Sequence, residues 1–310
     1  MLNQGVSDMD WAYFLDLFMS GLTKGSIYAL IALGYTMVYG IIQLINFAHG
    51  EIYMIGAFVA LITATILASM GLNIVFVFLL STLVAVIYSS AYGFTVEKIA
   101  YKPLRHASRL SPLISAIGMS IFLQNYVMLS QTADFVPFPE IIPVPSFLEK
   151  VADYVDPVGV VIIVVTVIVM IGLHLFVKKT KMGKAMRATA QNKTMAMLCG
   201  VDVDKTISLT FIIGSALAAI GGVLIGSYVG QINFFIGFIA GLKAFTAAVL
   251  GGIGSIPGAA LGGVVLGLTE SFGTGYISSD YEDVFAFIIL VLILIFRPAG
   301  ILGKSNTEKV

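Results

Sequence analysis

Three polar residues lie close together between two long apolar stretches near the start of the sequence. Asn46, His49 and Glu51 belong to the segment 45–51, which reads INFAHGE. Polar and ionisable groups at membrane depth are costly, and they usually face the interior of a helical bundle or a water-filled path. Gly50 lets the backbone leave the helical conformation where such a path is lined. The segment therefore predicts a broken helix that forms part of a substrate pathway or gate.

The alternative for this segment is a tight cytoplasmic turn in which Asn46 caps the following helix. A metal site is not expected, because His49 and Glu51 lack the His-Glu-x-x-His spacing of zinc proteases and the chain has only three histidines. The single cysteine, Cys199, excludes an internal disulfide and an all-cysteine metal site. No nucleophile–base constellation is visible, so no catalytic residue and no metal ligand are predicted.

A glycine-rich run at 251–263 resembles a phosphate-binding loop only superficially. It lacks the Gly-Lys-Ser/Thr ending that holds phosphate and Mg²⁺. Residues 303–305 have that ending, but Pro298 stands where the earlier glycine is required. We therefore expect no nucleotide site and no cofactor in this chain, and the run 251–263 is expected to form a tight turn between closely packed helices.

Two isolated charges lie within apolar stretches in the C-terminal half. Lys243 follows the apolar segment 236–242, and Glu270 lies near the end of another apolar stretch. A long lysine stem allows its ammonium group to reach the membrane interface, and this is the placement we expect for Lys243. The alternative is an interior-facing cation in the pathway. Glu270 is likewise expected at the outer interface.

The basic segment 178–206 is longer than a bare connection between membrane helices requires. From residue 182 to 199 its apolar residues recur with helical spacing, and Gly200 is positioned to end the helix. The apolar face of such an amphipathic helix needs a partner. A docking groove on a cytoplasmic protein and the surface of the inner leaflet satisfy this requirement equally well.

These segments require a membrane scaffold to position them. The chain is 58% hydrophobic and only 11% charged, with a mean hydropathy of +1.00, so it cannot cover a soluble surface with charge. Its zero formal net charge gives no general attraction to nucleic acid. We predict an all-α, polytopic integral membrane bundle that forms a single domain over residues 1–310, with about 8–9 spans and possible broken helices. The candidate spans are 22–45, 52–70, 74–96, 112–131, 157–177, 207–229, 237–253, 257–273 and 284–297.

Most of the 17 lysines and arginines fall in three segments, 97–111, 178–206 and the stretch from 297 onward. Basic loops are retained in the cytoplasm, so all three segments and the C-terminus are predicted to be cytoplasmic. The proline-rich segment 132–156 contains one lysine among five acidic residues and is predicted to be an outer loop.

An Asn-Phe pair precedes a glycine-punctuated apolar stretch twice, at 46–47 and at 233–234. Inverted repeats are common in transporters, so the two regions are candidates for a duplicated unit.

Several blocks in order resemble the permeases of branched-chain amino-acid ABC transporters, most closely the H-type subunits of high-affinity leucine/isoleucine/valine importers. The blocks cover nearly the whole chain and lie at residues 25–58, 114–127, 182–201, 241–263 and 297–303. The resemblance implies a second, related permease, two cytoplasmic subunits that bind and hydrolyse ATP, and a periplasmic amino-acid-binding protein. It also implies that 182–201 is the loop that docks on the ATPase, with these residues as candidates: Met182, Met186, Arg187, Asn192 and Gly200.

The expected function is therefore a permease subunit, without its own ATP site, in an importer of branched-chain amino acids in the cell inner membrane. The substrate would cross by alternating access, with Asn46, His49 and Glu51 along the path. The alternative is an ion-coupled secondary carrier that uses Glu51 or Lys243 as its coupling group.

Overall fold

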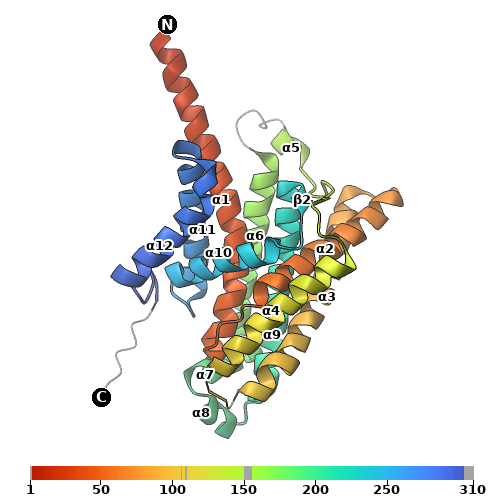
Figure 1. Ribbon diagram of the computed structural model, residues 1–310, viewed down its shortest axis with the longest axis vertical. Coiled ribbons are helices and arrows are strands. Elements are labelled where there is room, and N and C mark those ends of the chain that lie inside the picture. Colours follow the sequence, from red (N-terminus) through yellow and green to blue (C-terminus); the bar gives the residue numbers. More distant parts are fainter. Residues whose placement is uncertain (1, 106, 109, 150–155, 304–310) are drawn as a thin grey trace.

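The computed structural model describes residues 2–105, 107–108, 110–149 and 156–303 (Figure 1). Within this part of the chain, nine long helices correspond to the nine apolar stretches of the sequence, and the predicted all-α bundle is confirmed. They are α1 Leu2–Ile42, α2 His49–Ser69, α3 Ile74–Val96, α4 Leu110–Ser130, α6 Pro157–Lys179, α9 Val203–Val229, α10 Ile236–Gly251, α11 Ile256–Tyr276 and α12 Glu282–Phe296.

Short elements connect these helices. A π-helical turn, η1 (Glu97–Tyr101), and a 3-10 turn, η2 (Lys102–Leu104), follow α3. The helices α5 (Ser146–Glu149), α7 (Lys181–Gln191) and α8 (Lys193–Leu198), and the turn η3 (Ser279–Tyr281), occupy other connections. The only strands among the described residues, β1 (Val136–Pro137) and β2 (Gln231–Ile232), pair antiparallel over two residues each.

Seven of the helices are long and apolar enough to cross a membrane by themselves. The helices α10 and α12 are equally apolar but have only 16 and 15 residues, and a full crossing of the hydrocarbon takes about 20. The exact number of crossings therefore remains a prediction.

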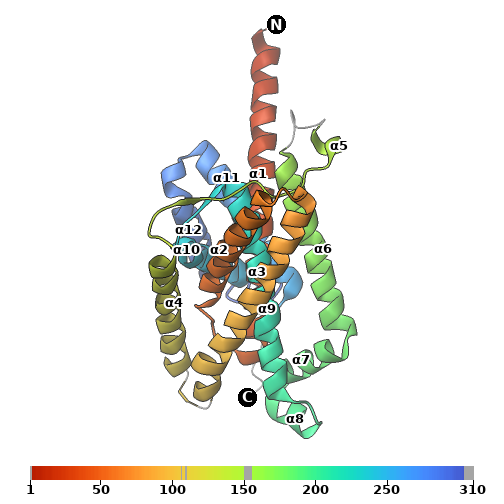
Figure 2. The ribbon, with the colours of Figure 1, turned by 90° about the vertical axis from the view of Figure 1, so that its right-hand side faces the viewer.

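Helix α1 lies at the centre of the bundle. It packs against α11, α9, α10 and α6, and most of its apolar segment is buried. In contrast, α3, α4 and α6 expose many large apolar side chains, which suits contact with lipid or with another membrane subunit. Figure 2 shows α4 and α6 on opposite sides of the bundle, with α2, α3 and α9 between them.

The two ends of the bundle differ in charge. The turns η1 and η2 and the helices α7 and α8 lie at one end, whereas α5 and the small sheet lie at the other (Figure 1). Lys102 and Arg105 lie in the first basic segment, 97–111. Both form ion pairs with Asp204, which lies in the first turn of α9 and within the second basic segment, 178–206. Two of the three basic segments therefore share one end, as predicted. Residues 304–310 lie outside the described part, so the cytoplasmic placement of the C-terminus stays a prediction.

Candidate functional site

The expected break between the first two membrane helices is present. Helix α1 ends at Ile42 and α2 begins at His49. Figure 1 shows that α2 begins well inside the bundle, away from the end at which α7 and α8 lie. The connection therefore places Asn46, and the first turn of α2, in the protein interior.

Asn46 does not cap α2. The N-cap residue is Ala48, which makes no side-chain hydrogen bond, so the capping interpretation is wrong. Instead, the Tyr101 hydroxyl donates to Oδ1 of Asn46 at 3.0 Å and to the carbonyl of Ile45 at 3.2 Å. Because Tyr101 lies in η1, this contact ties the break to the end of α3.

His49 and Glu51 lie in the first turn of α2. The His49 ring packs edge-on against Tyr35, with centroids 4.7 Å apart. Ser120 of α4 donates to Oε1 of Glu51 at 2.9 Å. Asn46, His49 and Glu51 are 2%, 1% and 0% exposed.

Each of these three side chains keeps one buried polar atom without a hydrogen-bond partner in the structure. The atoms are Nδ2 of Asn46, Nε2 of His49 and Oε2 of Glu51. Buried polar atoms are paired in the great majority of cases, and an unpaired one costs free energy. Three such atoms in one segment indicate that its polar side chains are retained although their burial costs free energy.

Helices α2 and α10 cross closely at this point. A Cβ atom on Gly50 would overlap the backbone of Gly237 and approach Gly241 to 2.9 Å. Only glycine therefore fits at position 50, and the first turn of α2 lies directly on the first turns of α10. The two Asn-Phe pairs precede these two helices, so the regions singled out as a possible duplication are in contact. Their common origin remains a prediction.

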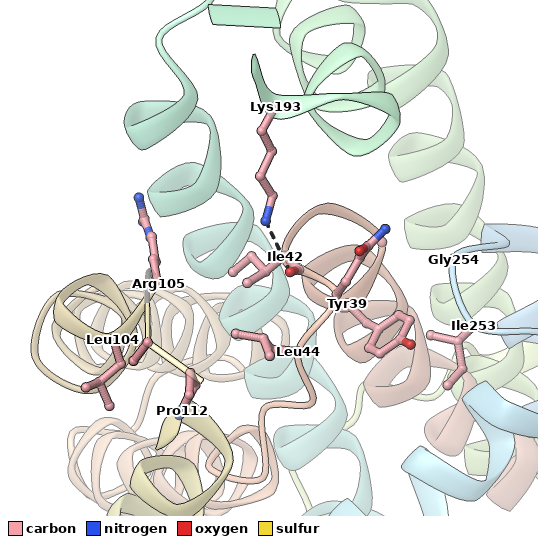
Figure 3. A pocket seen from close by; sticks show the side chains of 12 residues that line it. Tyr39, Ile42, Leu44, Leu104, Arg105, Pro112, Lys193, Ile253 and Gly254 are labelled. Carbon is pink, nitrogen blue, oxygen red and sulfur yellow. Dashed lines mark hydrogen bonds between the residues drawn. The ribbon is translucent and has the colours of Figure 1, made fainter. Parts of the chain in front are cut away.

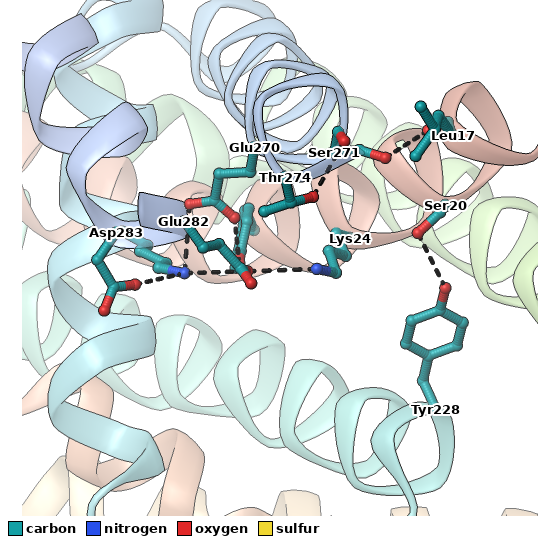
Figure 4. A network of polar contacts seen from close by, with 11 residues as sticks. Leu17, Ser20, Lys24, Tyr228, Glu270, Ser271, Thr274, Glu282 and Asp283 are labelled. Carbon is teal, nitrogen blue, oxygen red and sulfur yellow. Dashed lines mark hydrogen bonds and ion pairs between the residues drawn. The ribbon is translucent and has the colours of Figure 1, made fainter. Parts of the chain in front are cut away.

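A second polar cluster was not anticipated. Lys243 of α10 is 5% exposed, and its ammonium group lies 3.3 Å from Glu270, 3.3 Å from Glu282 and 2.8 Å from Asp283. Lys24 of α1 also pairs with Glu282, at 3.2 Å. Figure 4 shows these groups converging from α1, α10, α11 and α12.

Lys243 is therefore an interior-facing cation, as in the alternative placement, rather than an exposed snorkelling one. Glu270 is completely buried, and it accepts a hydrogen bond from the Tyr28 hydroxyl at 2.8 Å. Lys243 and Glu270 lie on neighbouring helices and pair with each other, which compensates the burial of both charges. Two opposite charges in consecutive apolar stretches were the sequence signal for this pairing.

The basic segment after α6 forms two helices where the sequence predicted one. Asn192 adopts an extended conformation between α7 and α8, and its side chain accepts a hydrogen bond from the Met195 amide at 3.0 Å. Asparagine competes with the helical backbone in this way and is favoured as an N-cap. The predicted end is confirmed: Gly200, with φ +83°, follows α8 in the left-handed region.

The apolar face of α7 packs within the chain itself. Met186 is 3% exposed and lines a small pocket together with Met37 of α1 and Val177 of α6. Arg187 donates to the carbonyl of Val177, and Met182 is half-buried. Neither a partner groove nor a lipid surface is needed to cover this face, which differs from both alternatives that the sequence left open.

Replacing Asn192 by alanine is expected to loosen α8 without unfolding the bundle. Loss of an N-cap side chain costs about 1 kcal/mol of local helix stability. Hydrogen exchange should speed up at the Met195 amide and its neighbours and stay unchanged in α9. Equal protection of α8 in the Asn192→Ala variant and the wild type would contradict the capping role.

A cavity of about 520 Å³ lies between the end of α1, η2, α8 and the turn from α10 to α11 (Figure 3). Its polar lining includes Tyr39, Gln43, Arg105 and Lys193. The Lys193 ammonium donates to the carbonyl of Ile42 at 3.2 Å. Burial lowers the pKa of Lys193, and the Arg105 charge lowers it further.

Comparison with known proteins agrees with this architecture. The family model for the permease component of branched-chain amino acid transport systems matches residues 17–294. The chain is 52% identical to the high-affinity branched-chain amino acid transport system permease protein BraD of Pseudomonas aeruginosa, over 96% of this chain and 98% of that protein. It is 49% identical to LivH of Escherichia coli K12 over the same shares, and 29% identical to a probable LivH of Methanocaldococcus jannaschii over 88% of each chain. The chain is an integral membrane protein, and it belongs to the family of permease components of branched-chain amino acid transport systems.

Proposed function

We propose that this chain is the membrane-spanning subunit of an importer that moves branched-chain amino acids across the cell inner membrane. The single observation that carries the proposal is its 52% identity, over 96% of the chain, to a permease named for high-affinity transport of these substrates. The substrate is zwitterionic with an apolar side chain, and no chemistry is done on it. Two separate ATP-binding subunits supply the energy, a second related permease completes the pathway, and a periplasmic protein delivers the amino acid.

The ATPase docks on the α7–α8 segment. Because Met186 is buried within the chain, we assign the direct contact to α8, while Met182, Met186 and Arg187 hold α7 on the bundle. The exposed side chains of Met195, Met197 and Leu198 form an apolar surface on α8, and Leu198 is 78% exposed. A short helix with a free apolar surface suits a groove on a soluble partner. Asn192 and Gly200 set the two ends of this helix.

A charge on α8 is expected to release the ATPase subunits. In the Leu198→Glu variant a carboxylate would enter an apolar contact, and burying an unpaired charge is strongly unfavourable. Co-purification of the ATPase subunits should fall, while membrane insertion stays normal. Gln191→Glu, which adds the same charge at the exposed end of α7, is the matched control and should retain the subunits. Normal co-purification with Leu198→Glu would exclude α8 as the contact.

We assign the substrate pathway to the buried segment around the start of α2. Asn46, His49 and Glu51 supply polar atoms with unused hydrogen-bonding capacity, and polar groups of this kind inside a membrane protein mark substrate paths. They lie in the closed interior of this conformation, so the substrate reaches them only when α2 and α10 separate during alternating access.

Proteoliposomes that contain the complete complex test the proposed function. Leucine, isoleucine or valine should accumulate only with ATP on the ATPase side and the binding protein on the opposite side. Uptake by this chain alone, driven by an ion gradient, would instead identify a secondary carrier. Glu51 and Lys243 would then be the coupling groups to examine first.

A further inference from the structure

The end of α1 has an unusual backbone conformation. Gln43, the first residue after the helix, has φ +61° and is the only non-glycine residue with positive φ among the described residues. Its amide donates to the carbonyl of Tyr39 at 2.7 Å. Side chains other than glycine rarely adopt this conformation, and it persists only where the surroundings hold it.

Lys193, the first residue of α8, supplies one such constraint. Its ammonium group contacts the carbonyl of Ile42, the last residue of α1, from a position 151 residues away in the chain. The last four carbonyls of a helix lack intrahelical partners, and a cation near them is favoured by the helix dipole. The last turn of α1 contains no basic residue of its own, so α8 provides the charge that this helix end lacks.

This contact joins two elements across a cavity. Lys193, Gln43 and Leu44 all line the 520 Å³ space (Figure 3), so the end of α1 is not packed into a continuous apolar core there. Among the ion pairs of the described residues, none includes Lys193. The neighbouring Arg105 instead pairs with Glu97 and Asp204. The carbonyl of Ile42 is therefore the partner that orients the Lys193 side chain.

The chain that follows this contact leads directly to the polar segment. Residues 43–48 connect the capped end of α1 to the first turn of α2, and Tyr101 fixes the same connection from the side of α3. A shift of α8 would therefore act on this connection before it reaches His49 and Glu51.

We propose that Lys193 is a positioning residue through which a movement of α8 sets the conformation of segment 43–48 and so of the start of α2. The proposal rests on the proposed function, in which the ATPase moves the α7–α8 segment. Rotation or withdrawal of α8 removes the cation from Ile42, which frees Gln43 to leave its left-handed conformation and lets the start of α2 move away from α10.

The test uses the complete complex in proteoliposomes. In Lys193→Met, the long side chain remains but the ammonium group is lost. ATP hydrolysis should continue, while the amount of leucine imported per ATP falls about tenfold, within the usual range of couplings between sites. Lys193→Arg should restore most of the import, because its guanidinium can also donate to the Ile42 carbonyl. Lys184→Met, at an exposed position on α7, is the matched control and should leave import per ATP unchanged.

A second measurement reports on the segment itself. Cys199 is the only cysteine, so a Cys199→Ser, Leu44→Cys chain carries one thiol beside the cavity. ATP should change the rate at which this thiol reacts with a water-soluble reagent, and adding Lys193→Met should abolish that change. If Lys193→Met fails to assemble, Lys193→Gln is judged by the same two measurements.

The outcomes separate the two proposals. Import per ATP and labelling that are unaffected by Lys193→Met would overturn the role of Lys193 but leave the proposed function intact. Absence of ATP-driven import by the wild-type complex would instead refute the proposed function itself.

Discussion

Replacing Lys243 by methionine is expected to destabilise the bundle by about 3–5 kcal/mol, the usual cost of removing one partner from a buried ion pair. Glu270 would keep the hydrogen bond from Tyr28 but lose the cation 3.3 Å away. Methionine fills a similar volume, so the loss arises mainly from uncompensated charge. The thermal unfolding midpoint of the purified protein in detergent should fall markedly relative to the wild type.

The double variant Lys243→Met, Glu270→Gln separates charge from packing. It removes both members of the buried pair, so it should recover much of the stability lost in the single variant. Lys205→Met is the control for removal of a lysine from an ion pair, since Lys205 and Asp202 pair at the surface. This control should leave the midpoint nearly unchanged. A double variant that is no more stable than Lys243→Met would show that methionine disturbs packing rather than charge.

Much of the architecture follows from the sequence because a membrane imposes simple rules. Each apolar stretch that enters the bilayer had to become a helix, since lipid cannot hydrogen-bond to an open backbone. The nine expected stretches accordingly correspond to nine helices. Basic residues at 97–111 and 178–206 indicated which connections share one end. A break within the segment 45–51 was predicted from Asn46, His49 and Glu51, which interrupt two apolar runs. The break itself lies at residues 43–48, and Gly50, where the backbone was expected to leave the helix, is helical in the first turn of α2.

What the sequence could not supply was the neighbour of each polar side chain. Lys243 is a lone charge within an apolar stretch, and a snorkelling lysine would have the same sequence pattern. Its burial follows from three carboxylates on α11 and α12, which only the tertiary packing brings to it. Met186 is a similar case, because its periodic spacing shows that an apolar face exists without showing which surface covers it.

The apolar spacing of the α7–α8 segment does not show where its helices begin and end. The apolar spacing favoured one helix from 182 to 199, whereas Asn192 starts a new one. The apolar spacing in the sequence does not show that the helix is interrupted at one residue. A local hydrogen bond decides whether an asparagine caps a new helix. The division matters for function, since it turns α8 away from the buried face of α7 and leaves Leu198 exposed.

Glu51→Gln is expected to reduce leucine uptake at least about tenfold, which corresponds to about 1.4 kcal/mol in the limiting barrier. The side chain keeps its length, and the amide oxygen can still accept from Ser120, so the change mainly removes the ionisable group. If Glu51 lines the path, the zwitterionic substrate loses the negative charge that favours its ammonium group. Uptake into proteoliposomes and the unfolding midpoint of the same preparation are measured together.

Ser120→Ala is the matched control for this prediction. It removes the 2.9 Å hydrogen bond to Glu51 but leaves the carboxylate in place, so stability should fall by about 1 kcal/mol while uptake per folded complex stays near the wild-type value. Glu51→Gln should show the reverse pattern, with uptake lost and stability largely kept. If both variants instead lose uptake only in proportion to folded protein, Glu51 acts as a structural group that joins α2 to α4, and the path must lie elsewhere in the bundle.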